Sequence, residues 1–449
     1  MKLLNDLKLQ FESGLWALSP ELAVMDTILN EHPEILEMIN KDITGGKEAG
    51  GLGRQDMPTV EQIVRAAIYK EMKNLSYREL EYAQYDSRMC AVFIKLDDRK
   101  PFSFEVYQKY ISRISGETLN KVLITINKIA IGEGMETGRS VRIDSTVVET
   151  DIHYPTNNSL IWDCIKTIDK LLNKLKESGV DIKVRNYRKQ AKKNNFKINN
   201  TKPKDKRKEE FEKQLKLFRC GINQAERALG SALPNTSIGV AVIEALRDLL
   251  PKAEKVYDIS RRHELLGEVV PNKDKIFSIY EAHTDIIVKG SREVEFGHKV
   301  NLATGRSNLI LDCRIMDGNP ADSTLYKGVI ERLQDNYGMT PRDMVTDGGY
   351  ASKANDMAAQ DKGIVNIVFN KIRGSLQNIV TSKNIETRLK KWRSGMEAVI
   401  SNLKRGFNLF RCEWKTRERF DAKIYWNVIA YNIRVMTSAL LAKIQPQMQ

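Results

Sequence analysis

Three acidic residues that lie far apart in the chain, Asp144, Asp347 and Glu397, stand in settings that suit metal ligands. Asp144 lies in the segment VRIDSTVVE and Asp347 in DMVTDGGY, and both segments are typical of strands. Glu397 lies in RLKKWRSGMEAVISNLKRGF, whose pattern predicts one helix. Mg²⁺ takes oxygen ligands, and two such ions can bind the attacking and the leaving oxygen of a phosphodiester. If the fold brings the three carboxylates together, they form a site for metal-dependent phosphodiester chemistry.

Each strand acid also has a simpler explanation. A carboxylate buried in a central strand is costly unless it is paired. For Asp144 a metal would remove that cost, and the alternatives are that it caps a neighbouring turn or pairs with Arg142. Asp347 is followed by Gly348 and Gly349, which permit close backbone approach, but the same dipeptide is common in ordinary turns.

The predicted helix around Glu397 places cations beside this acid. At about 100° per residue, Lys390, Arg393 and Lys404 fall on the same face as Glu397. An adjacent apolar face for packing on the sheet is formed by Met396, Ile400, Leu403 and Phe407. The acid could bind metal while the cations hold DNA phosphates. The alternative is surface salt bridging, which is worth only about 0.3–0.5 kcal/mol per pair.

Charge and composition restrict the class of protein. The 449 residues include 72 Lys and Arg against 58 Asp and Glu, a formal net charge of +14, which indicates a polyanionic partner such as DNA. The five cysteines form no CxxC pair, which indicates a reducing compartment and argues against a structural zinc site. No segment, including the amphipathic N-terminus, approaches the roughly 20 apolar residues of a membrane helix. We expect a cytoplasmic, nucleoid-associated protein without a membrane partner.

The elements that must position the acids follow from periodicity. Residues 1–135 read as an all-helical N-terminal domain for DNA binding or dimerisation, in which Ser76 and Glu79 form a capping box. The tight turn before Ser76 suits a helix-turn-helix with Arg78 as a DNA contact, although a plain helical bundle fits equally well. Strands and helices over residues 136–155 and 273–440 predict a mixed α/β sheet with flanking helices as the catalytic domain.

Residues 156–272 predict a basic helical insertion after the first strand. Within residues 181–220 there are 15 Lys and Arg against 5 Asp and Glu. The aromatic residues interspersed there are Tyr187, Phe196, Phe211 and Phe218. Such a segment could hold phosphates while the aromatic rings stack or pack. The alternative is the solvated face of a long helical hairpin.

These motifs carry a resemblance. Arg393-x3-Glu397-x6-Lys404 matches the R-x3-E-x6-K part of the signature around the last catalytic acid of DDE transposases of bacterial insertion sequences. The family signature has a Tyr three residues before the Arg, where this chain has Lys390. RIDSTVVE and VTDGGY resemble the settings of the first two acids, and YEAHTDIIVKG, EFGHKV and DGNPADST resemble the less well classified insertion-sequence group. LSYRELE is similar to the helical end-binding domain of related transposases, and the resemblance covers most of residues 55–435.

The resemblance implies a ribonuclease-H-like catalytic domain in which Asp144, Asp347 and Glu397 bind two Mg²⁺ ions, with Mn²⁺ as a substitute. It implies cleavage at the terminal inverted repeats of the element and transfer of the freed 3′-OH into target DNA. By the same analogy, a dimer or higher assembly forms on paired ends. The DNA contacts near the cut are expected from Arg393, Lys404, Lys390 and Arg405. The candidates for lining the site are His153, Tyr154, His298 and Gly348.

Two other functions fit the same residues. A nuclease of the same fold would cut DNA without strand transfer. A transposase remnant would bind DNA without catalysis.

Overall fold

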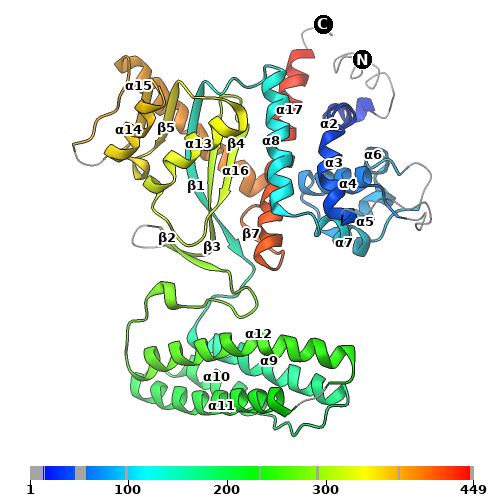
Figure 1. Cartoon of the computed structure of the whole chain (residues 1–449), viewed down its shortest axis with the longest axis vertical. Helices are drawn as coiled ribbons and strands as arrows, with labels where there is room; N and C mark the ends of the chain where they lie inside the picture. Colours follow the sequence, from blue (N-terminus) through cyan, green and yellow to red (C-terminus); the bar gives the residue numbers. More distant parts are fainter. Residues whose placement is uncertain are drawn as a thin grey trace. The chain divides into compact units, whose positions relative to one another are not determined.

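The computed structural model describes residue 14 and residues 16–45, 57–96, 100–231, 234–289, 293–372 and 375–444. Most of the predicted amphipathic N-terminal segment lies outside these residues. The chain forms two compact units, residues 1–150 with 297–449 and residues 151–296 (Figure 1). No helix in the described ranges is long and apolar enough to cross a membrane.

The N-terminal part of the first unit is helical. Its helices, after the short η1 (Trp16–Leu18), are α2 (Pro20–Glu31), α3 (Glu34–Thr44), α4 (Val60–Met72), α5 (Tyr77–Asp86), α6 (Arg88–Phe93), α7 (Phe104–Ile111) and α8 (Gly116–Gly132). The predicted capping box at α5 is present, because Ser76 and Glu79 exchange backbone-to-side-chain hydrogen bonds. Every residue of α4 from Gln62 to Met72 is buried. The C-terminal helix α17 (Arg417–Ile444) packs against α8, α2 and α4, so these helices share one hydrophobic core with the sheet.

The sheet is mixed, as predicted. Its strands are β1 (Ser140–Thr150), β2 (Asp285–Lys289), β3 (Glu293–Thr304), β4 (Ile310–Ile315), β5 (Asp343–Asp347), β6 (Asn366–Asn370) and β7 (Arg411–Cys412). The order is β2-β3-β1-β5-β6, with β4 paired to β3 and β7 to β1. β1 is antiparallel to β3 and parallel to β5, and β5 is parallel to β6. The α/β class and the two acid-bearing strands β1 and β5 are therefore confirmed.

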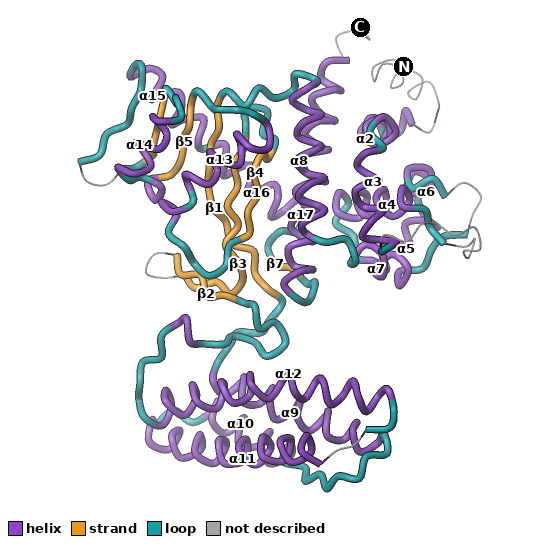
Figure 2. Tube along the Cα trace, viewed as in Figure 1, coloured by secondary structure: helices purple, strands orange, loops and turns teal. Residues whose placement is uncertain are grey.

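The helices that accompany the sheet are α13 (Tyr326–Tyr337), α14 (Lys353–Asp361), α15 (Lys383–Arg393) and α16 (Gly395–Gly406) (Figure 2). Short 3₁₀ turns, η4 (Asp322–Thr324) and η5 (Gly348–Tyr350), precede α13 and α14. Because side chains alternate along a strand, Arg142 and Asp144 of β1 share the face that contacts Trp392 and Arg393 at the end of α15.

One predicted element is wrong in detail. The segment around Glu397 was expected to form a single helix, but α15 ends at Arg393 and α16 begins at Gly395. A Cβ atom at Gly395 would lie 2.5 Å from Nη1 of Arg142, and this same nitrogen donates to the Trp392 carbonyl at 2.7 Å. The Arg142 guanidinium thus occupies the space at the break, which only glycine leaves open.

The second unit is a four-helix arrangement with a core of its own, made by α9 (Asn157–Glu177), α10 (Arg188–Asn200), α11 (Lys204–Ser231) and α12 (Ser237–Ser260) (Figure 2). The short η2 (Arg261–Leu265) and η3 (Asn272–Asp274) follow, before β2. Thr156 caps α9 by accepting a hydrogen bond from the Ser159 N–H, and Thr236 caps α12 in the same way through Gly239. The predicted helical character of residues 156–272 is therefore present.

Candidate active site

Three elements that are distant in sequence position the acids. Asp144 lies within β1, Asp347 is the last residue of β5, and Glu397 lies in the first turn of α16. The parallel register pairs Ile143 with Thr346, so the two aspartates follow neighbouring positions on adjacent strands. The sheet therefore holds these two backbone positions rigidly, while α16 supplies the third acid.

All three carboxylates meet one guanidinium, that of Arg393. Its Nη2 lies 2.7 Å from Asp144 Oδ2 and 3.9 Å from Asp347 Oδ1, and its Nη1 lies 3.5 Å from Glu397 Oε1. We call these four residues the Arg393 cluster. The sequence predicted that the three acids converge, and the structure places them around a shared cation.

Burial changes steeply across the Arg393 cluster. The exposed fraction of the side chain is 8% for Arg393 and 20% for Asp144, but 45% for Asp347 and 72% for Glu397. Arg393 Nε is buried without a hydrogen-bond partner. Since three ionised carboxylates surround one guanidinium, the cluster has a formal charge of −2. An exposed site with surplus negative charge can accept a cation from solvent.

Burial dominates the electrostatics of Asp144. Desolvation raises the pKa of this carboxyl above its ordinary value, while the Arg393 charge and the Ser145 N–H act in the opposite direction. The Asp347 and Asp322 charges add to the increase in pKa. A nearby divalent cation would stabilise the ionised form and remove this penalty.

Arg142, the sequence-based alternative partner of Asp144, is engaged elsewhere. This guanidinium is 1% exposed and donates to Thr304 Oγ1, the Trp392 carbonyl and Asn308 Oδ1. Its hydrogen bond to the Trp392 carbonyl fixes the last turn of α15, which carries Arg393. The alternative in which Arg142 pairs with Asp144 is therefore not realised, because Arg142 has a different set of partners.

A fourth carboxylate lies near the Arg393 cluster and was missed by sequence reasoning. Asp322 Oδ1 accepts from Lys299 Nζ at 3.1 Å, and a Cβ atom at Gly349 would lie 3.1 Å from its Oδ2. Its charge raises the pKa of both Asp144 and Tyr350. The signal in the sequence was the block DGNPADST, but only the fold reveals that Lys299 of β3 holds this acid.

The predicted cations beside the site have separate contacts. Lys390 pairs with Glu386 at 2.6 Å, and Lys404 Nζ lies 5.4 Å from the centre of the Phe410 ring. Arg405 is exposed. The expected shared face of Lys390 and Glu397 is interrupted by the break between α15 and α16.

Arg78 lies on α5, the second helix of the predicted helix-turn-helix. It is exposed, and its guanidinium lies 4.9 Å from the centre of the Phe104 ring. A DNA contact there remains a prediction.

His298 packs inside the first unit. It is fully buried, with its ring edge-to-face against Phe420 and Nδ1 3.3 Å from Arg417 Nη1. Both partners lie on α17, and strand pairing places His298 opposite Val148 rather than Asp144. These contacts indicate a packing role.

The other candidates for lining the site also have defined surroundings. In the second unit, His153 Nε2 lies 3.4 Å from Asp163 Oδ2, and the Tyr154 ring packs edge-to-face on Phe296. In the first unit, a Cβ atom at Gly348 would lie 2.5 Å from the Lys371 carbonyl oxygen. Gly348 is therefore needed for close packing of the chain after β5 against the end of β6.

The donor set of the Arg393 cluster fits a hard divalent cation, because it consists of carboxylate oxygens with a net charge of −2. Among the residues that the structure describes, no three His, Cys, Asp or Glu side chains are already grouped as metal ligands. The reason at this cluster is that the carboxylates are directed at Arg393. A metal held by them would have to share these oxygens with the guanidinium.

Comparison with known families agrees with this geometry. Residues 286–433 match the family model described as "Transposase DDE domain". The matched range contains Asp347, Arg393 and Glu397, whereas Asp144 precedes it. No curated protein and no solved structure matches the chain. The match confirms the resemblance to DDE-type transposases of insertion sequences.

Proposed function

We propose that this DDE-type transposase binds the terminal inverted repeats of an insertion sequence, cleaves the ends by Mg²⁺-dependent hydrolysis and joins the 3′-OH to target DNA. The observation that supports this proposal is the convergence of Asp144, Asp347 and Glu397 on Arg393, from three elements of the sheet domain. The domain is proposed to be ribonuclease-H-like, since a mixed sheet with the acids on β1, β5 and a following helix accords with that class.

Each residue of the Arg393 cluster has a proposed role. The carboxylates of Asp144, Asp347 and Glu397 would hold Mg²⁺, with Mn²⁺ as a substitute. When bound, the metal stabilises charge on the attacking and leaving oxygens of the phosphodiester. Arg393 balances part of the charge of the three carboxylates before the metal binds, and its guanidinium then contacts a phosphate near the cut.

Three further cations extend this DNA contact. Lys390, Lys404 and Arg405 lie on α15 and α16, the helices that carry Arg393 and Glu397. We assign them to backbone phosphates that flank the cleaved bond. Two subunits of the protein would hold the paired ends, since symmetric ends favour a symmetric assembly.

The proposal is tested by incubating the purified chain with a duplex that carries the end of its own element, Mg²⁺ and a supercoiled target plasmid. Wild-type protein should release a 3′-OH at the element's end and give joined products. Glu397→Gln and Asp347→Asn should abolish both, whereas Asp335→Asn, which removes an exposed acid of α13, should abolish neither.

Three results would contradict parts of the proposal. Cleavage without joined products would favour a nuclease of the same fold. Binding without cleavage by the wild-type protein would favour a non-catalytic remnant. Cleavage that persists in Glu397→Gln would place the chemistry elsewhere.

A further inference from the structure

The positive charge of the chain is concentrated in one short segment of the second unit. Residues 183–208, which comprise α10, the loop residues on either side of it and the first five residues of α11, hold 12 Lys and Arg against a single acid, Asp205, a net charge of +11 (12 − 1). The whole chain has +14, so all other residues together contribute only +3 (14 − 11). We call residues 183–208 the basic segment.

All twelve cations of the basic segment are exposed. Among the described residues, the only ion pair that involves one of them joins Lys197 to Glu210 at 3.9 Å. Helix α12 of the same unit differs, because its acids Asp248 and Glu254 are paired with Lys252 and Arg219. Charges that are exposed and lack acidic partners repel one another unless an anionic ligand neutralises them.

Helix α10 orders part of this charge into one face. Ala191, Asn194 and Ile198 are buried and attach α10 to the bundle. At about 100° per residue, the outer face contains Arg188, Lys189, Lys192 and Lys193. Helical spacing therefore presents four cations over about one and a half turns, which suits the regular spacing of phosphates on a DNA strand.

An aromatic side chain lies in the middle of this cationic face. Phe196 is 69% exposed, although a Phe is usually buried, and helical spacing places it between the directions of Arg188 and Lys193. An exposed ring among cations is the arrangement by which proteins stack on unpaired bases while holding the backbone.

We propose that the outer face of α10 is a second DNA-binding surface, in which Arg188, Lys189, Lys192 and Lys193 hold backbone phosphates and Phe196 stacks on an unpaired base. The inference rests on the proposed function, because that function supplies a DNA substrate with exposed strand ends. It assigns to the second unit a DNA contact that is separate from the Arg393 cluster.

The first test measures binding of the full-length protein to a random-sequence 40-base-pair duplex in EDTA, across a range of salt concentrations. The variant replaces the four α10 cations with Gln. Because each phosphate contact contributes about 0.9 to the slope of log affinity against log salt, the slope should fall by about 3 to 4. The affinity at physiological salt should fall at least tenfold.

The matched control replaces four exposed cations of α9 and α12 in the same unit, Lys170, Lys174, Arg247 and Lys255, with Gln. It removes the same charge as the first variant, but away from the outer face of α10. Its slope should therefore remain close to that of the wild type. Equal slopes for the two quadruple variants would overturn the proposal. A loss seen with duplex RNA but not with duplex DNA would also overturn it, in favour of an RNA ligand.

The role of Phe196 is tested with a duplex that bears a short single-stranded flap. Phe196→Ala should weaken binding of the flap substrate roughly fivefold or more and leave blunt duplex binding unchanged. Ile238→Ala, which removes another exposed apolar side chain of this unit, should change neither. Equal effects on flap and blunt DNA would contradict stacking. Because all these measurements omit metal, they are independent of whether the Arg393 cluster cleaves DNA.

Discussion

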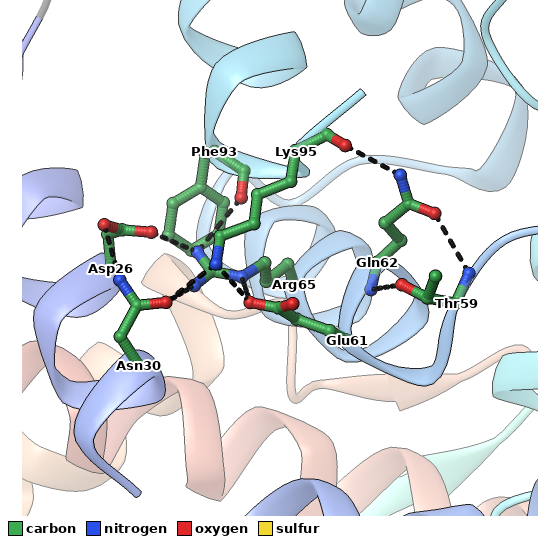
Figure 3. Close-up of polar contacts among 8 residues, drawn as sticks. All are labelled: Asp26, Asn30, Thr59, Glu61, Gln62, Arg65, Phe93 and Lys95. Carbon is green, nitrogen blue, oxygen red and sulfur yellow. Dashed lines mark hydrogen bonds and ion pairs between the residues drawn. The ribbon is translucent and has the colours of Figure 1, made fainter. Parts of the chain in front are cut away.

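Two buried arginines of the first unit, Arg65 and Arg393, each lie among carboxylates. Arg65 of α4 is fully buried and donates to Asp26 Oδ1 at 2.6 Å, Glu61 Oε1 at 2.9 Å, Asn30 Oδ1 at 2.9 Å and the Phe93 carbonyl at 3.1 Å (Figure 3). Arg393 contacts three carboxylates but retains a buried Nε without a hydrogen-bond partner.

Charge separates the two arginine clusters. Around Arg65, Lys95 also pairs with Glu61, so two cations balance the carboxylates of Asp26 and Glu61. In the Arg393 cluster, one guanidinium faces three carboxylates. A neutral and saturated network ties α2, α4 and the end of α6 together, which is a structural task. A surplus of negative charge that opens toward solvent is suited to a ligand instead.

The largest expected effect is on catalysis. Asp144→Asn should reduce single-turnover cleavage of the element's end by at least about 10³-fold, because a neutral amide is a poor metal ligand. Asp26→Asn, the same change in the Arg65 cluster, should leave cleavage by the folded protein unchanged. Comparable losses in both variants would erase the functional distinction between the clusters.

The next effect is on stability, and here the larger loss is expected in the Arg65 cluster. Asp26→Asn should lower the free energy of unfolding by about 3 kcal/mol, since it leaves the buried Arg65 charge without a full partner. Urea denaturation measures this difference. Asp248→Asn removes the exposed partner of Lys252 and should cost less than about 0.5 kcal/mol. A loss for Asp26→Asn as small as this control would show that the Arg65 network is not structural.

Metal affinity should reveal the competition between Arg393 and a cation. Arg393→Gln changes the cluster charge from −2 to −3, so Mn²⁺ should bind about tenfold more tightly in the absence of DNA. Isothermal titration calorimetry measures this change. Arg405→Gln removes an exposed cation of α16 and should have little effect. Weaker Mn²⁺ binding by Arg393→Gln would mean that the guanidinium organises the ligands rather than opposing the metal.

The smallest effect concerns pH. Burial raises the pKa of Asp144 above its ordinary value of 3.8, so ionisation of this group destabilises the fold as pH rises through the raised value. Asp144→Asn removes that ionisation. The variant should therefore be slightly more stable than the wild type at pH 7, and the difference should shrink toward pH 4. A stability difference that does not vary with pH would contradict this.

The sequence was sufficient for features that depend on local pattern. The strands around Asp144 and Asp347 were predictable because their segments are rich in β-branched residues, and the Ser76–Glu79 capping box is local by nature. The expected convergence of the three acids came from the resemblance to DDE transposases. Burial on all sides of α4 was not predictable. Its sequence pattern shows one apolar face, whereas in the fold α17 also packs against α4 and every residue from Gln62 to Met72 is buried.

The features that were missed depend on contacts across long stretches of chain. Arg393 reaches Asp144 over 249 positions, while Arg142 is nearer in sequence but turns toward Trp392. The guanidinium of that same Arg142 occupies the space at the break before Gly395. Asp322 joins the site only because the sheet brings Lys299 beside it.

The most direct test of the central claim is Mn²⁺ binding to metal-stripped protein, followed by electron paramagnetic resonance. Two matched double variants each remove two carboxylates from an arginine cluster, Asp144→Asn with Asp347→Asn, and Asp26→Asn with Glu61→Gln. The first should abolish binding of Mn²⁺, and the folded fraction of the second should bind it as the wild type does. Undiminished Mn²⁺ binding by the first double variant would contradict the assignment of the Arg393 cluster as the metal-dependent site.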